Sequence, residues 1–195
     1  AGRELALTSV TLRTLDALGD VAGARVFVRA DLNVPLRDRS VADDSRIRAT
    51  LPTIEELLAR GARLVVASHL GRPKGLVRDE LRLAPVGEAM ADLLGRPVTA
   101  VTEVTPASLP DDELVLLENL RFYLEEEGKG ATKEQIAAFK ASLTKLGDVY
   151  VNDAFGTAHR AHASMVGVTL PQRAAVIPGE AEGDALMLPR APIRA

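Results

Sequence analysis

The chain has 195 residues, of which 47% are hydrophobic and 26% charged, as in a globular protein that buries a core. Its 24 Lys and Arg against 27 Asp and Glu give a net charge of -3, and only 3% of residues are aromatic, so we expect no nucleic-acid partner. There is no cysteine, no apolar run near the ~18 residues of a membrane span and no secretory signal at the start, so we expect a cytoplasmic protein with no membrane contact.

Six runs of aliphatic and β-branched residues predict strands. They are apolar on successive residues, which is typical of strands buried on both faces of a parallel sheet. The runs cover residues 25–30, 63–68, 97–102, 114–117, 148–151 and, more weakly, 174–177.

Helical patterns separate these strands. Residues 43–60 have apolar side chains at spacings of three and four, and we expect Pro52 to divide this stretch. Residues 84–94 form a second helix that ends at Gly95. Thr132 and Gln135 make a capping-box pattern at the start of a third helix. The stretch Glu125 to Glu127, followed by Gly128, predicts only a solvated turn.

Strand and helix alternate about five times along the chain. This alternation predicts an α/β fold with three layers. We expect a doubly wound, mainly parallel sheet of about six strands with helices on both faces, which is a Rossmann-like arrangement.

Polar side chains directly follow four of the predicted strands. Because the carboxyl ends of parallel strands lie along one sheet edge, these loops should converge there. Arginines gathered in an acidic protein indicate an anionic ligand, and several guanidinium forks indicate more than one anionic group. A small phosphorylated hydroxy acid would use all of the groups present. The candidate binding residues are Asp31, Asn33, Arg46, His69, Arg72, Arg121, His159 and Arg160.

Other interpretations of single residues remain open. Asp31 and Asn33 are also common in turns, and Arg121 could pair with Glu118 at the surface. His159 and His162, with Asp153, have the spacing of metal ligands, but the neighbouring arginines disfavour a cation, so we expect no metal. Neither common glycine-rich phosphate loop for nucleotides occurs.

Five segments resemble a known family, in the family's own order from about residue 12 to about residue 174. They are VRADLNVP at 28–35, DDSRIRA at 43–49, SHLGRPKG at 68–75, LENLRF at 117–122 and GDVYVNDAFGTAHRAHAS at 147–164. Together they are similar to the N-terminal domain of phosphoglycerate kinase.

The resemblance implies a glycolytic phosphotransferase. Such an enzyme transfers a phosphoryl group from 1,3-bisphosphoglycerate to MgADP, which gives 3-phosphoglycerate and MgATP, and catalyses the reverse reaction. Asp31 and Asn33 match the residues for the substrate carboxylate and hydroxyl. The basic patch for the phosphate matches His69, Arg72, Arg121, His159 and Arg160. Arg46 matches the catalytic arginine beside the transferring phosphoryl group.

The chain also departs from the family pattern. Leu32 replaces the usual Phe, and the end of the chain does not resemble the family's nucleotide-binding domain. We therefore expect a substrate-binding domain over residues 1–177, an atypical flexible tail over 178–195, and no C-terminal nucleotide domain. MgATP or MgADP would be bound by that absent domain, and this chain would be inactive alone unless a separate nucleotide-binding domain joined it. The alternatives are a non-catalytic anion-binding or regulatory module, or an engineered folding scaffold.

Overall fold

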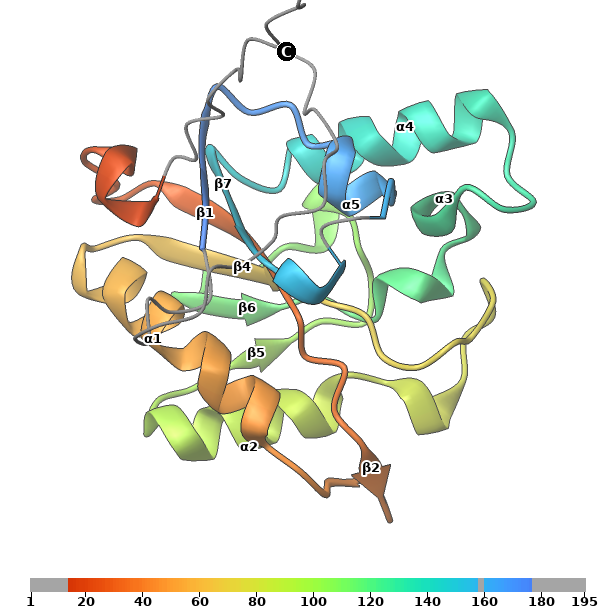
Figure 1. Ribbon diagram of the computed structural model, residues 1–195, viewed down its shortest axis with the longest axis horizontal. Helices are drawn as coiled ribbons and strands as arrows, with labels where there is room; N and C mark the ends of the chain where they lie inside the picture. The colour runs from red at the N-terminus through yellow and green to blue at the C-terminus, as the bar shows by residue number, and fades with distance from the viewer. Residues whose placement is uncertain (1–13, 158–159, 177–195) are drawn as a thin grey trace, which may run out of the picture.

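A six-stranded parallel sheet forms the centre of the molecule (Figure 1). The computed structural model describes residues 14–157 and 160–176, and the predicted tail over 178–195 lies outside them. The strands are β1 (Arg25–Ala30), β4 (Arg63–Ala67), β5 (Thr99–Ala100), β6 (Leu114–Leu116), β7 (Val149–Asp153) and β8 (Gln172–Ala175). Their order across the sheet is β5-β6-β4-β1-β7-β8. This confirms the predicted α/β class.

The strand bounds differ from the prediction mainly at the carboxyl ends. β7 continues to Asp153 and pairs Asn152 with Arg29 of β1, so its last two residues belong to the sheet rather than to a loop. β5 is only two residues long, and β8 begins earlier than predicted. A short hairpin of β2 (Leu36–Arg37) and β3 (Ser40–Val41) was not predicted.

Helices cover both faces of the sheet, as predicted. In Figure 1, α1 and α2 lie below the sheet, and α3, α4 and α5 lie at its other side. The helices are α1 (Ser45–Ala59), α2 (Ala84–Leu94), α3 (Leu124–Glu127), α4 (Lys133–Thr144) and α5 (Ala163–Val166). Single 3-10 turns occupy Leu15–Leu18, Asp79–Leu81, Pro106–Ser108, Leu120–Phe122 and Phe155–Thr157.

The prediction that Pro52 divides the first helix was wrong, because α1 is continuous through it. Proline removes one helical amide donor, whose acceptor would be the carbonyl of Arg48. Both residues are exposed, so the helix loses this hydrogen bond on its solvent side, while Ile47 and Ile54 remain fully buried on the other. Burial of the apolar face therefore outweighs the proline.

The core is split by the sheet into two apolar clusters. Val26 and Val28 of β1 pack with Ile54 of α1 on one face, whereas Phe27 packs with Phe139 of α4 on the other. Successive β1 residues are thus buried on opposite faces, as the continuous apolar run indicated. The capping box of Thr132 and Gln135 is present at the start of α4.

The solvated turn predicted for Glu125 to Glu127 was wrong. These residues form α3, which ends at the left-handed Gly128, and Glu126 is only 1% exposed. Two hydrogen-bond donors of Ser164 satisfy the buried carboxylate. The sequence favours a solvated turn because Glu126 stands among glutamates and glycines. Its partner Ser164 lies 38 residues away in the chain, so local composition does not reveal it.

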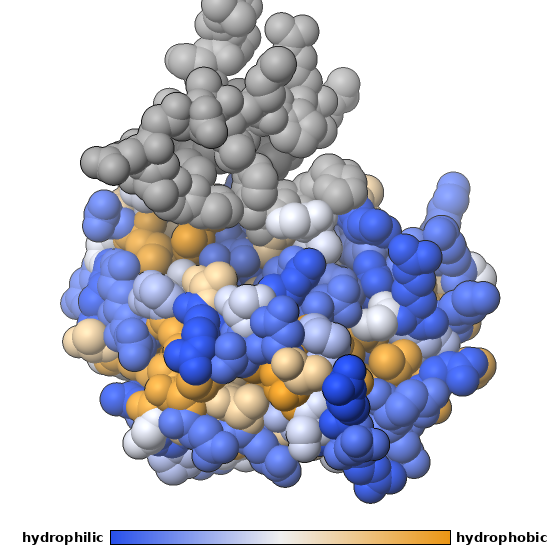
Figure 2. Space-filling view, turned by 60° about the horizontal axis from the view of Figure 1, so that its bottom comes forward, coloured by the Kyte–Doolittle hydropathy of each residue, from blue (hydrophilic) through white to orange (hydrophobic). Residues whose placement is uncertain are grey.

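The face of the molecule drawn in Figure 2 is mainly hydrophilic. The space-filling view shows apolar patches between larger hydrophilic areas (Figure 2). Among the described residues, no helix combines the length and apolar character that a membrane crossing requires.

Candidate functional site

The loops after β1, β4, β6 and β7 meet at one edge of the sheet. The strand order reverses at β1, because the chain passes to β4 on one side and to β7 on the other. Open α/β sheets bind ligands at such a reversal, outside the carboxyl ends of the strands. The topology therefore brings the predicted strand-end residues together.

Hydrogen bonds tie these loops to one another. The amide of Gly71 donates to Asn33 Oδ1 at 2.9 Å, and the carbonyl of Gly71 accepts from Arg121 Nη1 at 2.8 Å. Ser68 Oγ donates to the Ala30 carbonyl and accepts from the Leu32 amide, both at 2.9 Å. Three separate segments are thus held in fixed relation.

The buried side chain of Asn119 links the segment after β6 to the segment after β4 and to Leu81. Its Oδ1 accepts from the amides of Leu70 and Arg121, both at 3.1 Å, and its Nδ2 donates to the carbonyls of Leu70 and Leu81. With both its oxygen and its nitrogen engaged, Asn119 supports the loops rather than binding a ligand.

A pocket of about 250 Å³ lies where the loops meet. It is lined by Asp31, Asn33, Arg46, His69, Gly71, Arg72, Arg121, Gly156, Thr157 and Arg160. Every predicted site residue lines it except His159, which lies outside the described residues. Gly71, Gly156 and Thr157 were not predicted.

The pocket's basic residues fall into two groups. Arg46, Arg72 and Arg160 are exposed, and we call them the rim. Arg46 Nη1 lies 2.5 Å from Asp31 Oδ2, so this arginine is held against the first loop. His69 and Arg121 are only 3% and 6% exposed.

Arg29 lies behind His69 and is fully buried. We call His69, Arg121 and Arg29, together with their buried partners Glu126 and Ser164, the base. Burial lowers the pKa of Arg29 and of Arg121. Burial and the nearby Arg29 and Arg121 charges lower the pKa of His69 to about 2. His69 is therefore neutral, and the arginines supply the positive charge.

The acidic residues near the base form other ion pairs than the expected one. Arg121 Nε lies 3.3 Å from Glu127 Oε1, whereas Glu118 accepts from Arg82 Nη1 at 3.0 Å and from the Leu83 amide. The hypothesis of a surface pair between Arg121 and Glu118 was thus wrong. Glu118 thus binds the segment just before α2, and Arg121 pairs with Glu127 of α3.

His162 is 8% exposed and lies beside α3. Its Nδ1 and Nε2 are each 3.9 Å from a carboxylate oxygen, of Glu126 and Glu127 respectively. Burial lowers its pKa. In the part of the chain that the structure describes, no group of three or more His, Cys, Asp and Glu side chains is arranged to hold a metal ion.

Asp153 ends β7 beside the first loop. Burial raises its pKa to about 7, and the carboxylate of Asp31 acts in the same direction. Within the described residues its buried Oδ2 has no hydrogen-bond partner. A carboxyl group in such surroundings favours the protonated form.

Three residues of the base, Arg29, Glu126 and Ser164, were also missed in the sequence. Arg29 had a signal, because a charged residue inside an apolar strand is buried with a partner. Glu126 had none, because it follows no strand and belongs to no unusual pattern, and Ser164, the last residue of the 147–164 segment, was not singled out as a site residue. Gly156 approaches the pocket closely, since a Cβ there would lie 3.1 Å from Asp31 Oδ2.

Comparison with known proteins identifies the family. The family model described as phosphoglycerate kinase matches residues 15–184. Phosphoglycerate kinase 2 of Sus scrofa is 51% identical over 179 residues, which are 83% of this chain and 43% of the relative. Phosphoglycerate kinase of Schistosoma mansoni is 52% identical over 172 residues, which are 80% of this chain and 41% of the relative.

Solved structures give the same result. The phosphoglycerate kinase from Coxiella burnetii superposes with a TM-score of 0.74 at 32% identity, covering 85% of this chain and 41% of that structure. The chain thus spans about two fifths of the length of the relatives it matches. Since the family model covers most of its residues, the chain belongs to the phosphoglycerate kinase family.

Proposed function

We propose that this chain is the 3-phosphoglycerate-binding half of a phosphoglycerate kinase. The observation that carries the proposal is the convergence of Arg46, Arg72, Arg121 and Arg160 on one pocket of an acidic protein. These arginines come from four separate segments, and each could have pointed elsewhere. Their convergence supports a ligand with more than one anionic group.

3-Phosphoglycerate fits the distribution of groups around the pocket. Its phosphate would bind the guanidinium groups of Arg72, Arg121 and Arg160 and the neutral imidazole of His69. The resemblance adds His159, which lies outside the described residues. Its carboxylate and hydroxyl would lie by Asp31 and Asn33, whose side chains supply acceptors and an amide donor. A metal ion is not needed for this binding, because guanidinium groups neutralise the charge.

Arg46 would be the catalytic residue. It is exposed on the rim, where a phosphoryl group arriving from a nucleotide would enter the pocket. A substrate carboxylate is already ionised at neutral pH, so attack on phosphorus requires no general base. Catalysis would then depend on positioning and on neutralising charge in the transition state, which Arg46 can supply once Asp31 releases it.

In this proposal the nucleotide would bind outside the described residues. The matched relatives are more than twice as long as this chain, and MgATP or MgADP would bind to a second domain. We infer that the 195-residue chain binds 3-phosphoglycerate or 1,3-bisphosphoglycerate but does not turn over by itself. A nucleotide-binding domain would complete the site, and the expected location is the cytoplasm.

Isothermal titration calorimetry with 3-phosphoglycerate tests the binding. We expect one site per chain, and about tenfold or greater loss of affinity in Arg72→Ala, since hydrogen bonds to charged groups contribute about 1.5–3 kcal/mol. Arg48→Ala is the matched control, because Arg48 is exposed on α1 and pairs with Asp44 at 2.9 Å. No heat with the wild-type chain would refute the proposal.

A coupled assay tests whether turnover requires a nucleotide-binding domain. The chain alone should give no turnover with ATP and 3-phosphoglycerate, and addition of a separately produced nucleotide-binding domain should restore activity. Absence of turnover after this addition, together with tight 3-phosphoglycerate binding, would instead favour a non-catalytic binding or regulatory module.

A further inference from the structure

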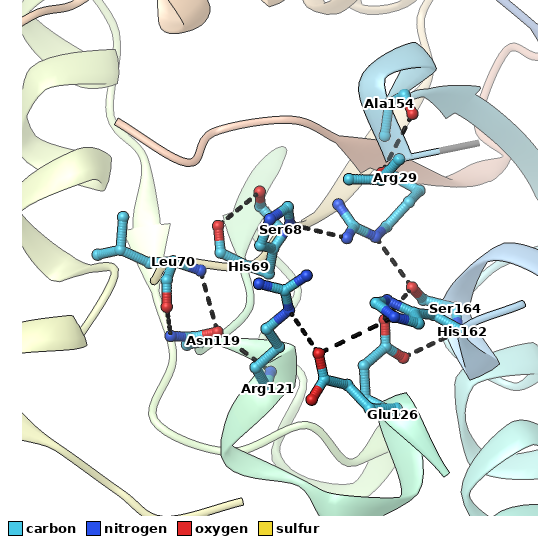
Figure 3. Close-up of polar contacts among 12 residues, drawn as sticks. Arg29, Ser68, His69, Leu70, Asn119, Arg121, Glu126, Ala154, His162 and Ser164 are labelled. Carbon is cyan, nitrogen blue, oxygen red and sulfur yellow. Dashed lines mark hydrogen bonds and ion pairs between the residues drawn. The ribbon is translucent and has the colours of Figure 1, made fainter. Parts of the chain in front are cut away.

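A chain of hydrogen bonds runs beneath the pocket from α3 to His69 (Figure 3). Arg29 Nε donates to Ser164 Oγ at 2.9 Å, and Ser164 Oγ lies 2.5 Å from Glu126 Oε1. The Ser164 amide donates to the other carboxylate oxygen at 2.9 Å. A hydroxyl has one hydrogen, and the carboxylate can only accept, so Ser164 Oγ donates to Glu126 and accepts from Arg29.

The other end of this chain sets the state of His69. Arg29 Nη2 lies 3.1 Å from His69 Nδ1. A guanidinium has only donors, so Nδ1 must accept and carries no proton. The imidazole is then neutral with its proton on Nε2. Because Nδ1 faces Arg29 and the residue lines the pocket, Nε2 is the ring nitrogen left for a ligand.

All members of the chain are removed from solvent. Arg29 and Ser164 are fully buried, Glu126 is 1% exposed and His69 is 3% exposed. Water therefore cannot replace a lost partner at low cost. The remaining guanidinium nitrogen of Arg29 donates to the Ala30 carbonyl, so this side chain is held on three sides.

We propose that Glu126 and Ser164 are positioning residues for the anion pocket. They orient Arg29, and Arg29 fixes His69 as a neutral imidazole whose Nε2–H donates to the bound phosphate. The step from tautomer to phosphate binding rests on the proposed function. The step from Glu126 to the tautomer does not.

The charges around His69 support a neutral ring. Arg29 faces it from β1, Arg121 from the segment after β6, and Arg160 and His162 from the segment after β7. Each of these disfavours a second positive charge on His69. Its contribution to anion binding is thus a directed hydrogen bond rather than a charge.

Removal of the Glu126 charge separates this proposal from simple electrostatics. A site that lost one nearby negative charge would bind anions more tightly if charge alone mattered. If Glu126 acts by positioning Arg29 and His69, the same change weakens binding.

The first test is nitrogen-15 NMR of the histidine side chains in the wild-type chain without ligand. The sequence has three histidines, so His69→Gln assigns the His69 signals. We expect a protonated Nε2 and an unprotonated Nδ1 that do not titrate between pH 5 and pH 8. A proton on Nδ1, or titration in that range, would overturn the proposal before any change at Glu126 or Ser164 is made.

The second test applies the same spectra and 3-phosphoglycerate titration to Glu126→Gln and Ser164→Ala. We expect a mixture of His69 tautomers and about tenfold weaker binding in each, since each change removes a hydrogen bond to a charged group. Glu125→Gln, on the same helix and outside the chain of hydrogen bonds, should match the wild type. An unchanged tautomer or tighter binding would refute the positioning role.

Ser164→Ala decides the question if Glu126→Gln does not fold, because the alanine is small and keeps the amide donor to Glu126. The two proposals also fail separately. A wild-type chain that binds no 3-phosphoglycerate would refute the proposed function, while the tautomer spectra would still show whether Glu126 and Ser164 control His69.

Discussion

The rim and the base of the pocket are both cationic, yet they are built in opposite ways. The rim arginines are exposed, and Arg46 is held by a half-exposed pair with Asp31. In the base, the Arg29 guanidinium is fully buried and its donors go to Ser164, His69 and a backbone carbonyl. The rim can thus change without disturbing the fold, whereas the base is part of the fold.

This difference assigns different tasks to the two regions. Exposed charges attract an anion over a distance of about one Debye length, roughly 8–10 Å at physiological salt, and their effect falls with added salt. Buried donors are fixed before the ligand arrives and lose little entropy when it binds. We therefore propose that the rim collects the ligand and that the base sets its orientation.

Glu126→Ala, a change in the base, should cause the largest loss of stability. It removes the carboxylate whose charge most favours the buried Arg29 guanidinium and that contacts it through Ser164 Oγ. Leaving a buried charge without its compensating partner costs about 3–5 kcal/mol. Urea denaturation should show this loss, whereas Glu125→Ala should stay within about 0.5 kcal/mol of the wild type. Equal stability of the two variants would mean that the base is not part of the fold's stability.

Asp153→Asn should remove a pH dependence of stability. Burial raises the pKa of Asp153 from 3.8 to about 7, so the folded chain binds this proton more tightly than the unfolded chain. The contribution of Asp153 to the free energy of unfolding is therefore fully present below pH 4 and is lost as the pH rises toward 7. At about 1.4 kcal/mol per pKa unit, the asparagine variant should gain about 2–4 kcal/mol over the wild type at pH 8 relative to pH 4.

Urea denaturation of both proteins at several pH values measures this difference, because the other titrating groups are common to both. A constant difference across the range would show that Asp153 titrates normally.

Arg160→Ala should separate ligand binding from stability. Arg160 is exposed on the rim, so the free energy of unfolding should change by less than about 0.5 kcal/mol. Affinity for 3-phosphoglycerate should fall about tenfold, since a hydrogen bond to a charged group is lost. Calorimetry and urea denaturation on the same sample check both, and a large stability loss would place Arg160 in the base instead.

Asp31→Asn should have the smallest effect on stability. The pair of Asp31 and Arg46 is 2.5 Å long, but the arginine side chain is 49% exposed. Such pairs contribute about 0–1 kcal/mol, so we expect a change below about 1 kcal/mol in urea denaturation. A larger loss would show that this rim pair also supports the loops.

The sequence was sufficient for the sheet and the rim. Continuous apolar runs predicted the strands, and polar residues directly after them predicted the pocket edge, because parallel topology places all carboxyl ends together. Arg46, Arg72 and Arg160 could be found in this way since each belongs to a segment that begins at the sheet edge. Their role in binding stays a prediction.

His69 and Arg121 of the base were predicted, whereas Arg29, Glu126 and Ser164 were not, because their contacts join residues that are distant in the chain. Arg29 and Ser164 are 135 residues apart, and only the folded sheet brings α5 against β1. Local composition also misled at Glu126, where neighbouring glutamates and glycines resemble a solvated turn, and at Pro52, where burial on one helix face outweighs a missing hydrogen bond.

The most direct measurement is a crystal structure of the chain with 3-phosphoglycerate. The account predicts the phosphate within hydrogen-bonding distance of His69 Nε2 and of guanidinium groups from both Arg72 and Arg121, with the carboxylate and hydroxyl by Asp31 and Asn33. A ligand bound away from this pocket, or a phosphate that contacts rim arginines while His69 faces elsewhere, would contradict it.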